Sequence, residues 1–185
     1  MERPPMKLTS ATLVAALTLV LAGCDQPPVN RDPSRPLSTV SRVDVQRYTG
    51  LWYEIARLPN QFERDCVGVT ATYAANDDGS IKVANLCRKH RLDGAQEAAQ
   101  GRARIVDHTT NAKLAVTFFW PFEGDYWILS LDPGYQWAIV GEPSGRYLWL
   151  LARTPRISPE LRARLVEQMQ AQGYNTRALY WTPQP

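Results

Sequence analysis

The sequence predicts an all-β fold: an eight-stranded antiparallel up-and-down β-barrel with one α-helix packed on its outside near the C-terminus. Two observations predict this class. Short segments of alternating apolar and polar residues follow one another from residue 52 to residue 152, and turn-forming residues without helical periodicity separate them. Such spacing is typical of an antiparallel sandwich or barrel and not of a wound α/β fold. Eight strands closed on themselves leave no free edge and enclose room for about one small ligand.

The first strand is predicted just after Gly50, in the stretch Tyr-Thr-Gly-Leu-Trp-Tyr-Glu-Ile-Ala-Arg at residues 48–57. Side chains alternate along a strand, so Trp52, Glu54 and Ala56 should share one face. A tryptophan beside a glycine at a strand start buries a large rigid side chain and needs a partner for its indole N–H. Taken alone, these residues fit an ordinary core tryptophan equally well.

A hairpin is predicted next, because alternating segments flank a strong turn at residues 76–79, Asn-Asp-Asp-Gly. If Tyr73 faces Ser80 across this turn, Cys66 falls directly opposite Cys87. Directly opposed positions can meet the distance that a disulfide requires. We expect the Cys66–Cys87 disulfide to form in an oxidising compartment, and two buried free thiols are the alternative.

Five more strands complete the predicted barrel. Turns rich in proline, glycine, aspartate and asparagine separate them, and no helical pattern interrupts them. They are expected at Ala98–Val106, Lys113–Phe119, Tyr126–Leu131, Trp137–Val140 and Tyr147–Ala152.

A helix is predicted from Ser158 to Gly173. Ser158 is a good N-cap with Pro159 after it, and Gly173 is a good stop signal. Apolar residues recur every four positions at Leu161, Leu165 and Met169, which indicates one face packed against the barrel. A short strand around residues 178–181 should follow.

The N-terminal region resembles a bacterial lipoprotein signal. Two basic residues, Arg3 and Lys7, are followed by an apolar stretch at positions 8–22. This stretch runs into Leu21-Ala22-Gly23-Cys24, which is similar to a lipobox. The resemblance implies that Cys24 becomes the mature N-terminus and carries acyl chains such as palmitate on its sulfur and amine. A plain cleaved signal peptide with an incidental cysteine is the alternative. Several acyl chains anchor a protein effectively permanently without spanning the membrane.

The predicted domain organisation has three parts. Residues 1–23 form the signal peptide, residues 24–42 carry the lipidated cysteine and a flexible proline-rich tether, and residues 43–185 form the barrel domain. The tether contains four prolines among polar residues and no apolar periodicity, so we expect it to be solvated and semi-extended.

The chain resembles the lipocalin family through two distant motifs, Gly50-x-Trp52 and the late strand Tyr-Leu-Trp-Leu-Leu-Ala-Arg that ends at Arg153. In that family the tryptophan closes the barrel floor and the arginine packs across it, as suits a planar cation over an indole face. The resemblance covers roughly residues 43–181 and is nearest to the branch of bacterial outer-membrane lipocalins and apolipoprotein D.

This branch implies a bacterial protein that is lipid-anchored in the outer membrane and faces the periplasm. Asp25, directly after the lipidated cysteine, resembles the signal that retains lipoproteins in the inner membrane, so that location stays open. The sequence also leaves open whether two barrels pair into a homodimer.

Candidate ligand-binding residues follow from strand parity and from the resemblance. The resemblance places Tyr126 and Trp149 in the pocket wall, and Phe118 and Trp120 could flank its mouth. Simple core packing is the alternative for each of them. The isolated carboxylate of Glu54 must pair, bind water or stay protonated, with Arg57, Arg104 and Arg153 as candidate partners. The predicted set is Glu54, Ala56, Phe118, Trp120, Tyr126, Ile128, Trp149 and Leu151.

Composition and motifs argue against other functions. Without residues 1–23 the net charge is about +2, too mild for a nucleic-acid-binding surface. The sequence has no nucleophile elbow, nucleotide loop or metal-spaced Cys/His cluster, so no catalytic residue, cofactor or metal is predicted. We expect a non-enzymatic carrier of fatty acids or lysophospholipids. A lipid-modifying enzyme that uses Glu54, or a structural lipoprotein without ligand, is the alternative.

Overall fold

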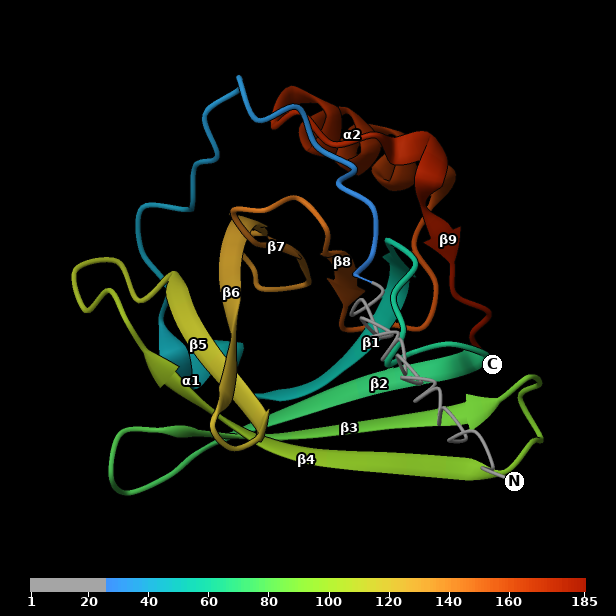
Figure 1. Ribbon diagram of the computed structural model, residues 1–185, viewed down its shortest axis with the longest axis horizontal. Helices are drawn as coiled ribbons and strands as arrows, with labels where there is room; N and C mark the ends of the chain where they lie inside the picture. Colours follow the sequence, from blue (N-terminus) through green and yellow to red (C-terminus); the bar gives the residue numbers. More distant parts are fainter. Residues whose placement is uncertain (1–25) are drawn as a thin grey trace, which may run out of the picture.

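The computed structural model describes residues 26–185 and shows antiparallel strands wrapped into a barrel, with a helix along one side (Figure 1). The predicted signal peptide, Cys24 and Asp25 lie outside the described residues. Among the described residues, no helix has the length and apolar character needed to cross a bilayer. The elements are α1 (Val45–Tyr48), β1 (Gly50–Arg57), β2 (Cys66–Ala75), β3 (Ile81–Lys89), β4 (Gln96–Ile105), β5 (Lys113–Phe119), β6 (Phe122–Leu131), β7 (Trp137–Gly141), β8 (Leu148–Ala152), α2 (Pro159–Ala171), η1 (Thr176–Ala178) and β9 (Tyr180–Trp181).

Eight strands close on themselves because β1 pairs with β8 on one side and with β2 on the other. Trp52 lies opposite Ala71 of β2, and Tyr53 lies opposite Ala152 of β8. The predicted fold class, an eight-stranded antiparallel barrel with a C-terminal helix, is confirmed. Short β9 pairs with the end of β1. The end of the barrel at α1 is called the closed end below, and the end at the β1–β2, β3–β4 and β5–β6 connections is called the mouth.

Two apolar cores lie on opposite sides of the barrel wall. Strand β8 shows the division, because Trp149 and Leu151 belong to the inner core while Leu148 and Leu150 belong to the outer core. The outer core also contains the predicted apolar face of α2, with Leu165 and Met169 completely buried against the strands. Burying a side chain of this size contributes about 1.5–3 kcal/mol, so α2 stabilises the barrel from outside.

The Cys66–Cys87 disulfide is present, with Cα atoms 5.5 Å apart, as predicted. The register predicted for its hairpin is wrong. Tyr73 pairs with Val83 and not with Ser80, and Cys66 therefore faces Lys89. The disulfide joins diagonal positions, which the sequence argument did not consider.

The register differs because the turn and the strand are both irregular. The last pair beside the turn is Ala75 with Ile81, so the strands run further towards the turn than was assumed. A bulge between Val67 and Thr70, where Gly68 adopts a φ of +56°, shifts the ladder again before the cysteine is reached. Alternating hydrophobicity carries no information about either irregularity.

A second bulge changes which side of the barrel wall the last residues of β1 face, relative to the prediction. The pairing with β8 shifts between Glu54 and Ala56, so Ile55 and Ala56 both contribute to the outer core. Ala56 is therefore not a residue of the barrel interior, and this prediction is wrong. Arg57, expected on the opposite face from Glu54, faces inward with it and lies opposite Trp149.

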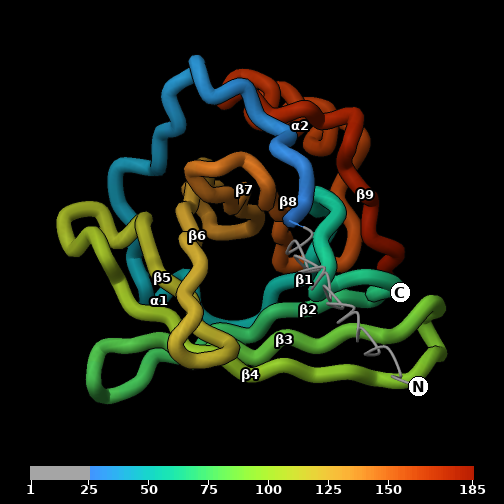
Figure 2. Tube along the Cα trace, in the orientation of Figure 1, coloured from blue at the N-terminus to red at the C-terminus, as the bar shows by residue number. Residues whose placement is uncertain are grey.

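The proline-rich segment lies against the barrel, which differs from the expected solvated tether. Arg31 is 8% exposed, and its guanidinium donates to the Gln172 carbonyl at the end of α2 and lies 5.9 Å from the Tyr174 ring centroid. Further along, the Val40 amide donates to Ile128 and the Val43 amide to Thr110. Figure 2 shows this segment passing beside α2 and then turning to α1. Composition gave no sign of these fixed contacts.

The C-terminal tail fills the seam between the mouth-side halves of β1 and β2. Direct pairing of the two strands stops at Tyr53, and the tail supplies the next hydrogen bonds. The Thr182 amide donates to Ile55, and the Gly68 amide donates to the Pro183 carbonyl. The Gln184 side chain bonds to one carbonyl on each strand. The tail thus satisfies backbone groups that would otherwise form a free edge.

Candidate ligand-binding site

The closed end is built on Trp52, which is completely buried. Its indole N–H donates to the Tyr48 carbonyl at 2.8 Å, so the one polar group of this large side chain is satisfied. The Arg153 guanidinium lies 3.8 Å from the ring centroid, as the two-motif resemblance implied. Gly50 has a φ of +94°, and a Cβ there would approach Arg153 Nη1 at 3.3 Å, which explains the glycine.

Arg153 also ties together the chain segments that meet at the closed end. Its guanidinium donates to the carbonyls of Arg47, Thr49 and Leu51 at 2.8, 2.9 and 2.7 Å and to that of Tyr135 at 3.2 Å. With the Tyr48 carbonyl at 3.4 Å, five carbonyls before and after Gly50 and in the β6–β7 connection share one planar donor. This arrangement seals the closed end.

A layer of three tyrosines lies above Trp52 inside the barrel. The Tyr126 hydroxyl is 2.8 Å from that of Tyr48 and 2.9 Å from that of Tyr73. Burial raises the pKa of Tyr73 to about 12 and raises the pKa values of Tyr48 and Tyr126 well above the ordinary value, so all three stay neutral. The void beside this layer measures about 10 Å³, roughly one water.

The barrel opens above the tyrosine layer. On β4, Ala103 is buried in the inner core, and by alternation Gly101 and Ala99 face inward too. Ala99 is nevertheless exposed, as is every residue from Gln96 to Gln100. The inner wall is therefore uncovered towards the mouth. Asn85, paired with Ala99, carries a buried side-chain oxygen for which the described residues supply no hydrogen-bond partner.

Glu54 finds its partner in Arg57, one of the three candidates. Arg57 Nη1 donates to Glu54 Oε1 at 2.6 Å and to the Thr182 hydroxyl at 3.1 Å, and Thr182 in turn bonds to Glu54. Arg57 also donates to the Glu63 carbonyl at 2.6 Å. The Glu63 carboxylate accepts the indole N–H of Trp149 at 3.0 Å. Arg57 Nε lies 3.7 Å from Glu63 Oε2, so one buried cation serves two carboxyl groups at the mouth.

The pKa of Glu54 is raised well above its ordinary value of 4.5, because burial and then the Glu63 carboxylate outweigh the attraction of Arg57. A carboxyl group whose pKa is higher in the folded protein than in the unfolded chain stabilises the fold when it is protonated. The stabilising contribution of Glu54 is therefore complete below about pH 4.5 and disappears as pH rises through the folded pKa. We expect the free energy of unfolding of the wild type, relative to Glu54→Gln, to fall as pH rises from about 4.5 to 8. Urea unfolding of both proteins across this range measures the difference.

Glu123→Gln is the control, because the Arg104 side chain lowers the pKa of the exposed Glu123 and any pH dependence from this group falls below about pH 4.5. Relative to that variant, the wild type should show no change in stability between about pH 4.5 and 8. Parallel curves for the wild type and Glu54→Gln would contradict a raised pKa at Glu54.

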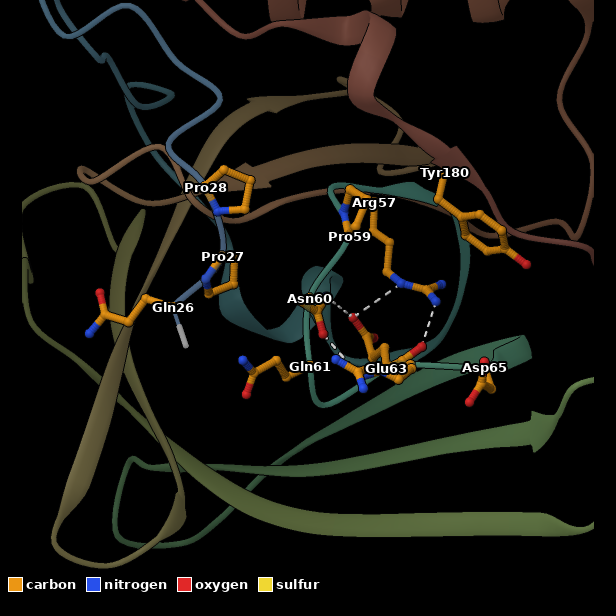
Figure 3. Close-up of a pocket in the computed structure, with 11 residues that line it drawn as sticks. Gln26, Pro27, Pro28, Arg57, Pro59, Asn60, Gln61, Glu63, Asp65 and Tyr180 are labelled. Atoms are coloured by element: carbon orange, nitrogen blue, oxygen red, sulfur yellow. Dashed lines mark hydrogen bonds and ion pairs between the residues drawn. The ribbon is translucent and has the colours of Figure 1, made fainter. Parts of the chain in front are cut away.

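A hollow of about 420 Å³ lies at the mouth, open to solvent (Figure 3). Arg57 and Tyr180 form one side, with the Arg57 guanidinium 4.6 Å from the Tyr180 ring centroid. The β1–β2 connection forms another side with residues 59–61 and 63–65, and the start of the described chain, residues 26–28, forms a third side. The hollow therefore lies between polar groups at the mouth and the N-terminal end of the described proline-rich segment, which is called the linker below.

The structure brings most of the predicted ligand-binding residues to the barrel interior or its mouth. Ile128 and Leu151 are buried in the inner core, and Tyr126, Trp149 and Phe118 pack against it while half-buried. Trp120 does not pack there, because it is 88% exposed at the tip of the β5–β6 hairpin. Ala56 is the one member of the set that lies on the outer side.

Sequence reasoning missed four contributors to the site: Tyr48, Tyr73, Glu63 and Asn85. The position of Tyr73 on the inner face of β2 could have been found, since it lies two residues from Ala71 on an alternating strand. Glu63 lies in an irregular connection, where no period exists to place it. Within residues 26–185, no group of three or more His, Cys, Asp or Glu side chains is arranged to hold a metal ion.

Fold and site together define a barrel that is sealed at one end and open at the other. A family model described as a lipocalin-like domain matches residues 43–184. The outer membrane lipoprotein Blc of Escherichia coli strain K12 is 36% identical over 181 residues, which cover 97% of this chain and 99% of that protein. Apolipoprotein D of Bos taurus is 32% identical over 149 residues, with coverage of 76% and 71%.

The fold comparison agrees. Insecticyanin from the tobacco hornworm Manduca sexta superposes with a TM-score of 0.66 at 18% identity, over 81% of this chain and 85% of that one. The chain belongs to the lipocalin family.

Proposed function

We propose that this protein binds an amphiphilic lipid, a fatty acid or a lysophospholipid, with its acyl chain inside the open half of the barrel and its headgroup at the mouth. The uncovered inner wall at Ala99 is the observation that carries this proposal. Apolar side chains of the inner core lie below this uncovered wall, and polar groups such as Asn85 and Glu63 lie where a headgroup would end. A few placed polar groups in an apolar pocket orient a ligand and give specificity.

Binding without turnover fits the site better than catalysis. Glu54, the acidic candidate, is 2% exposed and already bonded to Arg57 and Thr182. His90 and His108 lie on exposed connections away from the inner core. A general base must reach the proton that it removes, and neither histidine offers that reach.

The proposed location is the outer membrane, through lipid attached to Cys24. Support comes from the lipobox-like sequence and from the similarity to proteins named outer membrane lipoproteins. In this proposal the barrel faces the periplasm, an oxidising compartment in which its disulfide is stable.

A plug in the lumen tests the binding proposal. Ala99→Trp places an indole on the exposed inner wall without touching the buried core. We expect it to weaken displacement of a fluorescent fatty acid about tenfold or more, because each lost 1.4 kcal/mol of contact lowers affinity tenfold. The measurement is a competition titration with residues 26–185, which contain every described helix and strand.

Ala98→Trp is the matched control, since Ala98 is also exposed and, as the neighbour of Ala99 on the same strand, points to the outer side of the barrel wall. This variant should bind like the wild type. Equal binding by both variants would place the ligand outside the lumen, and absence of saturable wild-type binding at micromolar ligand would refute the proposal.

A further inference from the structure

Exposed aromatic side chains gather at the mouth. Phe62 on the β1–β2 connection is 67% exposed, and Phe119, Trp120 and Phe122 on the β5–β6 hairpin are 78%, 88% and 76% exposed. We call these four residues the aromatic rim. The strands run up and down, so both connections lie at the end opposite α1 and Trp52. Isolated surface apolar residues are normal, but three exposed aromatics within four residues of one hairpin, with a fourth on another connection at the same end, indicate an interaction site.

The linker delivers the chain to this same end. Gln26, Pro27 and Pro28 line the hollow beside the β1–β2 connection (Figure 3). Two contacts then fix the linker. The buried guanidinium of Arg31 donates to the Gln172 carbonyl, and the Asn30 amide donates to the Gly145 carbonyl at 2.9 Å. The linker is therefore held at the mouth and cannot swing freely around the barrel.

This attachment limits the distance between the proposed anchor and the mouth. Cys24 precedes Gln26 by two residues, so its Cα can lie at most about 7 Å from that of Gln26. A lipid chain on Cys24 must enter the bilayer from that point. The mouth is then forced towards the membrane surface, whereas the closed end, with α1, points away from it.

We infer that the aromatic rim docks into the interfacial region of a phospholipid bilayer, so that the barrel opens directly onto the membrane. The inference rests on the lipid anchor of the proposed function. Tryptophan and phenylalanine partition well into this region, where an apolar ring can be buried beside polar headgroups. The occupant of the rim is thus a lipid surface.

The side chains behind the rim continue this path into the barrel. The Phe62 ring lies 5.4 Å from that of Tyr147 in a stacked arrangement, and Tyr147 stacks on Trp149 at 5.8 Å. Trp149 packs against the inner core and donates to Glu63. A row of three rings therefore leads from the proposed membrane contact to the lumen, which would let an acyl chain leave the bilayer without crossing water.

Quenching of Trp120 fluorescence by brominated lipid tests the docking. The full chain, produced with its lipid attached, is reconstituted in vesicles of phosphatidylethanolamine and phosphatidylglycerol whose acyl chains carry bromine near the headgroup. The wild type should lose emission relative to vesicles without bromine, and Trp120→Phe should lose less than half as much. The phenylalanine keeps an apolar ring at the rim, so docking itself is preserved.

Trp120→Phe combined with Val106→Trp provides the matched control. Val106 is 52% exposed and follows β4 at the closed end, so an indole there should escape quenching. Equal loss in the wild type and Trp120→Phe, no loss in either, or stronger quenching at position 106 would overturn the docking. Two results from native mass spectrometry of the same protein would also overturn the docking. A doubled mass without quenching would assign the rim to a second copy of the chain, and a mass without acyl chains would remove the anchor. Fatty-acid displacement by residues 26–185 involves no vesicle, so failure of docking and failure of ligand binding are distinguished.

Discussion

Replacing Trp52 with alanine is expected to lower the free energy of unfolding by about 3–5 kcal/mol, as for other fully buried tryptophans. The indole is completely buried between the tyrosine layer and Arg153, and its N–H is bonded to the Tyr48 carbonyl. Removing it opens a cavity and takes away the flat surface on which the guanidinium lies. Urea unfolding with the disulfide intact measures the loss.

Trp120→Ala is the control, because it makes the same substitution at a side chain that is 88% exposed. Its stability should remain within about 0.5 kcal/mol of the wild type. If the two substitutions cost the same, Trp52 does not seal the closed end in the way described.

Replacing Arg57 with alanine is the second large effect, and we expect a loss of about 3–5 kcal/mol, as is usual when one partner of a buried ion pair is removed. The change leaves Glu54 and Glu63 without their shared cation and deprives the carbonyls of Glu63 and Cys66 of a donor. The loss should be smaller at acid pH, where a protonated Glu54 needs no cation. Unfolding by urea at acid and neutral pH measures both the size and the pH dependence.

Arg104→Ala is the appropriate comparison, since Arg104 was also a candidate partner for Glu54 and instead pairs with Glu123 on the surface. This exposed pair should contribute nothing measurable. A loss at Arg57 that is no larger, or that is independent of pH, would contradict the buried carboxyl cluster.

Most of the barrel could be predicted from the sequence, because alternation reports which residues face a core. The eight strands and α2 followed from period and caps, and the contact between Trp52 and Arg153 followed from the family resemblance. The failures occurred where the period breaks. The bulge after Glu54 moved Ala56 outside, and the bulge after Val67 helped to shift the cysteine register.

The site was harder to predict, because its polar parts depend on contacts between distant segments. The tyrosine layer needs two strands, β2 and β6, and α1 to be placed first, and Glu63 comes from an irregular connection. Proline-rich composition suggested a free linker, whereas Arg31 fixes it through the end of α2. Composition describes the solvation of a segment but not a single buried side chain within it.

The central claim is that the open half of the barrel holds an amphiphile. Native mass spectrometry of the protein, freshly isolated from a bacterial envelope, tests it most directly and also reports the oligomeric state. The account predicts a bound mass that corresponds to a fatty acid or lysophospholipid, present with the wild type and Ala98→Trp and depleted with Ala99→Trp. A bound lipid retained equally by Ala99→Trp, or an empty wild-type protein that also fails to take up added lipid, would contradict it.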